Sequence, residues 1–159
     1  MAMSAATLSK ELGAMGIYNS EVEATQAWAQ AFTNYFSTAV CGIIAVVPAA
    51  LAPAQAAMSA AMGGYVNDGT DAIEDGITAF WVSVGTNLAT IFPGAPLPVT
   101  PPPGLGSLSA DLEEVFKANS MPVGCMSRQV TLNAIAARIH ADNSGGTVGV
   151  FPGPVTPIT

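Results

Sequence analysis

A run of uncharged residues from position 24 to position 67 constrains the fold of this chain more than any other feature of its sequence. Its most apolar window, residues 39–54, is shorter than the roughly 20 residues that a membrane-spanning helix needs, and it contains Pro48 and Pro53. Gln55 follows the window directly, and its amide would be costly against lipid. We therefore expect helices that pack against protein, and a transmembrane hairpin is the alternative.

Charged side chains are scarce in the whole chain. They make up 9% of the 159 residues, against roughly 25% in an average soluble domain, and eleven Asp+Glu against four Lys+Arg give a net charge of −7. Such a chain has no basic surface to neutralise phosphate groups, so we expect no nucleic-acid partner. The length is that of one domain, and the apolar content is too high for a disordered chain.

Hydrophobic periodicity and capping signals predict helices in the first part of the chain. A short helix is expected over residues 6–15. A second should begin after Ser20, which forms a capping box with Glu23, and should continue until Pro48. A third, over residues 53–62, should begin with a proline and stop at a pair of glycines.

The clearest helix in the sequence is predicted over residues 71–92. Asp71 and Glu74 are expected to cap its start, where the helix dipole favours acidic side chains. A continuous apolar stripe over five turns of one face predicts that this face is buried. The stripe comprises Ile73, Ile77, Phe80, Trp81, Val84, Leu88 and Ile91.

A proline-rich stretch separates these helices from the second part of the chain. Residues 93–106 hold six prolines and three glycines, which predicts an extended connector. Ser109 is expected to cap a short helix beyond it, and a last helix is expected over residues 127–141. Residues 147–159 combine alternating apolar residues with three prolines, which predicts one short strand or an extended arm.

Together these segments predict an all-α fold with five or six helices, a proline-rich connector and an extended C-terminal arm. We divide the chain into a helical core at residues 1–92, the connector at 93–106, a helical pair at 107–146 and the arm at 147–159. An arm of this composition cannot bury itself, so we expect it to lie on another surface.

No set of residues in the sequence predicts a catalytic, cofactor-binding or metal-binding site. Cys41 and Cys125 have no zinc-site spacing with each other or with the single His140, and whether they are free thiols or paired stays open. His140 is expected at a helix end, and the acidic cluster around Asp71 and Glu74 is expected to be a solvated helix start. We expect no enzyme activity, no cofactor and no metal.

The scarcity of charge is the feature from which we infer function. A monomer of this length exposes roughly 30% of the surface of its unfolded chain, and so few ionised groups cannot cover it. Exposed apolar patches normally mark contact sites, so we expect neighbouring protein subunits to cover several faces, in a homo-oligomer and a hetero-assembly. The alternative is a plain monomer covered by its neutral polar side chains.

Three segments supply the residues that we expect in such contacts. One is the aromatic face of the second helix, which is typical of either a core or an interface. Another is the uncharged face of the helix over residues 71–92, which suits a partner helix better than solvent. The third is the C-terminal arm. The expected contact residues are Trp28, Phe32, Phe36, Thr78, Val82, Thr86, Val150 and Phe151.

The chain resembles a class of structural proteins in the virions of tailed bacteriophages. The resemblance rests on hydroxyl-rich and alanine-rich helices, on the break Pro93-Gly94-Ala95-Pro96 after Thr90-Ile91-Phe92, and on the trailing Phe151-Pro152-Gly153-Pro154. Proteins of that class are small, poor in charge and rich in Ala, Gly and Pro, and they serve as capsid cement, neck or tail components. The resemblance implies a location in the virion and assigns no individual functional residue.

The sequence supports three hypotheses about function. The first is a non-enzymatic helical subunit of a protein assembly, and the resemblance implies that this assembly is a virion. The second is a membrane-active protein with inserting segments at residues 39–54 and 77–92. The third is a small enzyme that uses His140 or the carboxylates near Asp71.

Overall fold

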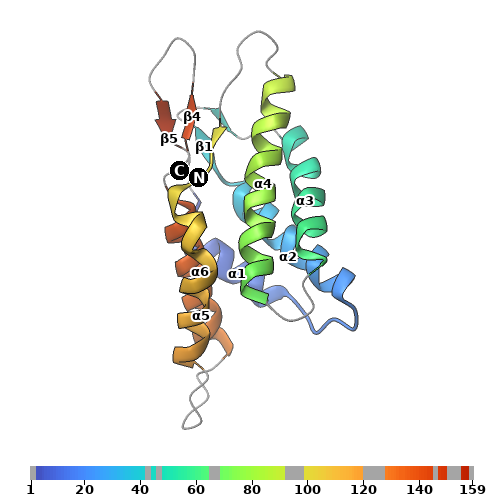
Figure 1. Ribbon diagram of the computed structural model, residues 1–159, viewed down its shortest axis with the longest axis vertical. Helices are drawn as coiled ribbons and strands as arrows, with labels where there is room; N and C mark the ends of the chain where they lie inside the picture. The colour runs from blue at the N-terminus through green and yellow to red at the C-terminus, as the bar shows by residue number, and fades with distance from the viewer. Residues whose placement is uncertain are drawn as a thin grey trace.

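The computed structural model of the protein describes residues 3–41, 44–45, 48–64, 69–91, 99–119, 128–144, 147–149 and 155–157. These residues form six α-helices, one short 3-10 helix and five strands of two or three residues. The core of the fold is therefore all-α, as the sequence predicts. Four of the helices, α3 to α6, run roughly along the long axis of the molecule, and the strands lie toward one end (Figure 1).

The first two helices begin where the sequence predicts. Helix α1 (Ala5–Ala14) is capped by Ser4, whose hydroxyl accepts a hydrogen bond from a backbone N–H of the first turn at 3.1 Å. Helix α2 (Glu21–Phe36) is capped by Ser20, whose hydroxyl accepts from the N–H of Glu23 at 3.2 Å. The Ser20 cap that the sequence predicts is thus confirmed.

Helix α2 is shorter than predicted, because it ends at Phe36 and not at the distant proline stop. The hydroxyls of Ser37 and Thr38 donate to backbone carbonyls of the last turn, at 2.6 and 2.8 Å. Hydroxyl groups that compete in this way for helix carbonyls weaken the continuation of a helix, and the β-branched residues that follow also disfavour it. Strands β1 (Val40–Cys41) and β2 (Ile44–Ala45) pair antiparallel in this region.

Helices α3 (Pro48–Met62) and α4 (Gly69–Ile91) lie side by side (Figure 1). Helix α3 begins at Pro48 and not at Pro53, which lies inside the helix. Proline fits the first turn of a helix, where the N–H has no intrahelical partner, so Pro48 is the better start. Helix α3 ends before Gly63, as predicted, and α4 agrees with the predicted helix to within two residues at each end.

The starts of α4 and α5 (Leu108–Asn119) meet in an arrangement that the sequence did not predict. The backbone N–H of Ser109 donates to the carboxylate of Glu74 at 2.7 Å, and the Ser109 hydroxyl donates to the carboxylate of Asp71. The N–H groups of a first helical turn lack intrahelical partners, so a carboxylate of α4 satisfies the start of α5. Ser109 was expected to accept a bond as the cap of α5 and is instead a donor to α4.

The proline-rich connector differs from the prediction in its second half. Residues 92–98 lie outside the described residues, and strand β3 (Val99–Thr100) follows them. Pro103–Ser107 then forms the 3-10 helix η1, where the sequence predicted an extended segment. Proline suits the first position of such a turn, and Leu105, which is buried in the core, holds η1 against the helices.

The second part of the chain packs directly on the first. Helix α6 (Arg128–Asn143) contacts both α5 and α1. Its apolar stripe, formed by Ile135, Ala136 and Ile139 at helical spacing, is buried. One hydrophobic core includes residues from all six α-helices of the described chain and from η1. The segments at 1–92 and 107–146 therefore share a core.

The C-terminal segment contains two strands, where the sequence predicted one strand or an extended arm. Strand β4 (Thr147–Gly149) pairs antiparallel with β5 (Val155–Pro157) on one side and with β3 on the other. Val148 stands opposite both Val99 and Thr156. Residues 150–154 and 158–159 lie outside the described residues.

Candidate interaction surface

The outward face of α4 is exposed and carries no charge beyond its first two turns. Val82 is 58% exposed, and Thr78 and Thr86 are exposed on the same face. The opposite face is buried in the core, as the apolar stripe predicts; its described members are Ile73, Ile77, Phe80, Trp81 and Val84. The hydroxyl of Thr86 donates to the carbonyl of Val82 at 3.0 Å, so a bond within the helix satisfies it. The structure thus places these three residues on the surface, as we expected.

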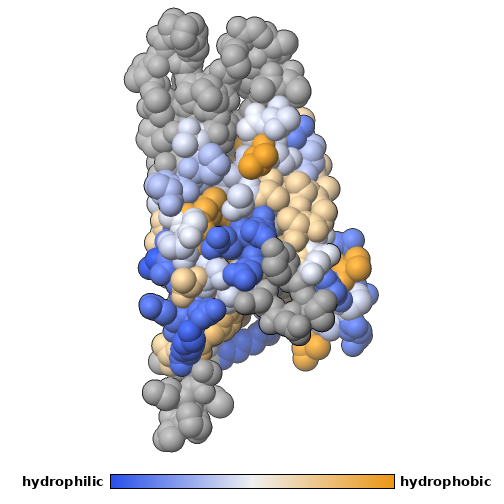
Figure 2. Space-filling model, in the orientation of Figure 1, coloured by the Kyte–Doolittle hydropathy of each residue, from blue (hydrophilic) through white to orange (hydrophobic). Residues whose placement is uncertain are grey.

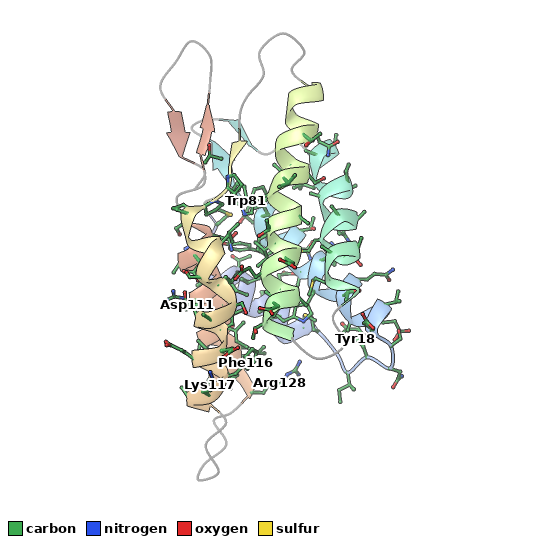
Figure 3. All side chains as sticks on the ribbon, in the orientation of Figure 1. Tyr18, Trp81, Asp111, Phe116, Lys117 and Arg128 are labelled. Carbon is green, nitrogen blue, oxygen red and sulfur yellow. The ribbon has the colours of Figure 1, made fainter. Side chains whose placement is uncertain are left out.

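The charged residues of the described chain lie away from this part of α4. They lie on α1, on α5, on α6, and at the starts of α2 and α4; they are Lys10, Glu11, Glu21, Glu23, Asp71, Glu74, Asp75, Asp111, Glu113, Glu114, Lys117, Arg128, Arg138 and Asp142. Figure 2 shows hydrophilic colours over α5 and around the start of α4, and neutral to apolar colours over the upper parts of α3 and α4. Asp111 and Lys117 lie along α5, and Arg128 lies near its lower end (Figure 3).

A groove of about 710 Å³ lies between α2 and α3. Its lining comprises Gln26, Ala27 and Gln30 from α2, and Ala52, Gln55, Ala56, Ser59 and Ala60 from α3. None of these side chains carries a charge. Sequence analysis did not single out this groove, although alanines at intervals of four residues, Ala52, Ala56 and Ala60, form a ridge along one side of a helix. The missing information was which helix lies opposite that ridge.

Amide side chains form a hydrogen-bonded chain beside the groove. The amide of Gln55 donates to Gln30 at 2.9 Å, and that of Gln30 donates to Asn34 at 2.8 Å. Asn34 in turn donates to the carboxylate of Glu11 at 2.6 Å. These bonds join α3, α2 and α1. An amide has both donor and acceptor atoms, so this side of the groove presents hydrogen-bonding groups of both kinds.

The aromatic face of α2 lies mainly in the core. Phe32 and Phe36 are 1% and 0% exposed, and Phe36 meets both Phe80 and Trp81 edge to face, with ring centroids 5.1 and 5.0 Å apart. Of the two alternatives for this face, core and interface, the structure selects the core for Phe32 and Phe36. Their place among the expected contact residues is therefore wrong for this conformation, because the large apolar area of an aromatic ring is already buried.

Trp28, the third residue of that face, is only partly buried. It lines a second hollow, of about 420 Å³, together with Ile73 of α4 and Phe116 of α5. Phe116 is 40% exposed, and its side chain lies on the surface of α5 (Figure 3). The expected contacts at Val150 and Phe151 lie outside the described residues.

His140, the candidate of the enzyme hypothesis, is paired with a core tyrosine. Its Nδ1 lies 2.7 Å from the phenol oxygen of Tyr35, which is fully buried, and burial raises the pKa of Tyr35. The other candidates, Asp71 and Glu74, bind Ser109 at the start of α5. These groups therefore join helices to one another.

Metal binding would need a group of acidic, histidine or cysteine side chains. In the part of the chain that the structure describes, no three His, Cys, Asp or Glu side chains are grouped closely enough to hold a metal ion. The side chain of Cys41 and the whole of Cys125 lie outside the described residues.

The membrane hypothesis concerns residues 39–54 and 77–92. Among the described residues, no helix is both long enough and apolar enough to cross a bilayer. Within α4, Ile77, Phe80 and Trp81 are buried against the other helices.

Comparisons with known proteins give no relative from which a site could be transferred. No family model, no curated protein and no solved structure matches the chain.

Proposed function

We propose that this protein is a non-enzymatic structural subunit of a multi-protein assembly, in which a neighbouring subunit covers the outward face of α4. One observation carries the proposal: Thr78, Val82 and Thr86 are exposed along α4 on a face that has no charge beyond Asp75. A helix that faces water normally carries charged side chains on its outer face.

Helix α5 of the same molecule provides the comparison. Its outer side carries Glu113, Glu114 and Lys117, and Lys117 pairs with Glu113 at 2.6 Å. Such i,i+4 pairs are typical of a solvated helix. Two helices of one molecule thus differ in the surface that they present, and contact with another protein is the simplest reason for an uncharged one.

The finer proposal is that the assembly is the virion of a tailed bacteriophage, with this chain as a cement, neck or tail component. It rests on the resemblance of the sequence to that class. The uncharged face of α4 is consistent with it, because subunits of such particles contact several neighbours.

A photo-crosslinking experiment tests the proposal. A photoreactive amino acid is placed at Thr86 on α4 and, as a matched control, at Glu114 on α5, where the side chain is also exposed. The chain is irradiated in its native source and then sized by sedimentation. We expect a particle much larger than the 16.0 kDa chain, with crosslinks to protein from position 86 but not from position 114. A 16.0 kDa monomer without crosslinks from position 86 would overturn the proposal.

A further inference from the structure

We infer that the groove between α2 and α3 is the contact site for a second copy of this chain, with α3 of one copy against α3 of the other. The inference rests on the proposed function, because it names one of the neighbours in the assembly. It concerns a different face from the outward side of α4, and it is argued from the lining of the groove and from the distribution of charge.

The lining of the groove suits a helix at close range. Ala52, Ala56 and Ala60 are exposed and all line the groove, so they form one ridge along α3. Residues four apart form the ridges that pack into the grooves of another helix, and small side chains allow the two axes to approach within about 8 Å. The ridge extends over about 12 Å of helix, or two turns. The helix that enters must itself present a ridge of small side chains, and α3 does.

The distribution of charge favours a copy of the same chain as the partner. The net charge of −7 makes two copies repel wherever their carboxylates face each other. The charged side chains of the described residues lie outside the groove, and those of α2 are confined to its first turn, whereas the lining of the groove carries none. A basic partner would be attracted to the acidic residues elsewhere and would gain nothing from a neutral groove.

The symmetry of a homodimer adds a second requirement, which the groove also meets. In a twofold contact the same surface lies against itself, so it must be self-complementary. Gln30 and Gln55 bear both donor and acceptor atoms, so each amide can pair with its own copy across the axis. The alanine ridge needs only an opposing groove of the same width.

A charge-swap experiment on the full chain tests the inference. The wild type, Ala56→Glu and Ala56→Lys are compared by sedimentation equilibrium at micromolar concentration, alone and as an equimolar mixture of the two variants. Position 56 is exposed in a helix, so both substitutions should fold, and circular dichroism checks this. The matched control is Ala137→Glu, which places the same charge at an exposed alanine of α6, outside both proposed contact faces.

We expect the wild type and Ala137→Glu to dimerise equally. Each variant at position 56 should weaken self-association at least about tenfold, because like charges face each other across the axis, and the mixture should restore the dimer. A wild type that stays monomeric at about 100 μM, an undiminished Ala56→Glu dimer, or a mixture that stays monomeric would each overturn the inference.

Failure of the inference and failure of the proposed function give different results. A monomeric wild type whose native form still crosslinks from position 86 leaves the assembly proposal standing and removes the α3 contact. A dimer restored by the charge swap, in a protein whose native form is no larger than that dimer, leaves the α3 contact and removes the larger assembly.

Discussion

The phenol oxygen of Tyr35 lies 2.7 Å from Nδ1 of His140, and this hydrogen bond joins α2 to α6 across 105 positions of sequence. The two rings are nearly perpendicular, with centroids 6.0 Å apart. Tyr35 has no exposed surface, and a buried phenol needs a hydrogen-bond partner. The single histidine of the chain supplies that partner, which is a structural role.

Substitution of Tyr35 by Phe tests this role. We expect Tyr35→Phe to lower the free energy of unfolding by about 1 kcal/mol near neutral pH, because one hydrogen bond is lost. Burial raises the pKa of Tyr35, so the folded state binds this proton more tightly than the unfolded state, in which the phenol ionises near pH 10. Wild-type stability should therefore fall as the pH rises above about 10, and part of that fall should be absent in Tyr35→Phe.

Urea denaturation near neutral and near pH 10.5 measures both effects. The control is Tyr18→Phe, because Tyr18 is at the surface. An equal loss of stability at high pH in the wild type and in Tyr35→Phe would show that the buried phenol does not cause the loss.

The indole of Trp81 depends on a second buried partner. Its N–H donates to Oδ1 of Asn143 at 2.8 Å, and the amide of Asn143 donates to the carbonyl of Ile139. Asn143→Ala would leave the indole N–H buried without a partner, so we expect a loss of about 1–3 kcal/mol in the free energy of unfolding. The measurement is urea denaturation followed by circular dichroism. Asn19→Ala, at an exposed position before α2, should change stability by less than about 0.5 kcal/mol, and an equal effect at both positions would contradict the prediction.

Local patterns in the sequence predicted the helices whose signals lie within one segment. The stripe on α4 and the stripe on α6 recur at helical spacing, and the cap at Ser20 lies within four residues of its partner, so neighbours along the chain determine each of them. The predicted end of α2 was wrong. The helical pattern of the sequence continues past Phe36, but the hydroxyls of Ser37 and Thr38 bond to carbonyls of the last turn and end the helix there. The predicted start of α3 was wrong because Pro48 and Pro53 could each begin a helix, and the local sequence does not decide between them.

Contacts between distant segments were beyond sequence reasoning. The bond between Ser109 and Glu74, and the pairing of Tyr35 with His140, depend on how the helices are arranged. For the same reason, only one part of the candidate surface could be predicted from the sequence. The face of α4 could be inferred from the composition of one helix, but the groove needs α2 beside α3.

Arg138 holds two carboxylates at the junction of α5 and α6. It forms ion pairs with Asp111 and, at 2.9 Å, with Asp142, which is only 7% exposed. We expect Arg138→Met to lower the free energy of unfolding by about 1–3 kcal/mol at neutral pH, because a nearly buried carboxylate loses its partner.

The effect of Arg138→Met should depend on pH. Burial raises the pKa of Asp142 above its ordinary value, and Arg138 opposes this shift. The folded state thus binds this proton more tightly than the unfolded state, so the contribution of Asp142 to stability falls as the pH rises from about 4 through its folded pKa. Without Arg138 the pKa rises further and the fall is larger.

Melting temperatures at about pH 4 and pH 7 check this prediction. The difference between the wild type and Arg138→Met should be smaller at the lower pH, where a larger fraction of Asp142 is protonated, than at the higher pH. Arg128→Met is the control, because Arg128 donates to the backbone carbonyl of Met15. A difference that is equal at the two pH values would contradict the ion-pair explanation.

Gly104 of η1 packs closely on α6. A Cβ atom at this position would lie 2.9 Å from Cα of Asp142 and 3.0 Å from its carbonyl oxygen. These are backbone atoms of a helix and cannot move without a shift of the whole element, so we expect Gly104→Ala to cost about 1–3 kcal/mol in the free energy of unfolding.

Gly106 lies in the same 3-10 helix with no atom within 4 Å of its Cβ position. Gly106→Ala should therefore be neutral or stabilising by up to about 1 kcal/mol, because it reduces the entropy of the unfolded chain. Chemical denaturation of the two variants separates the effects. If both alanines were tolerated equally, η1 would not rest on α6, and Leu105 alone would anchor the end of the connector to the core.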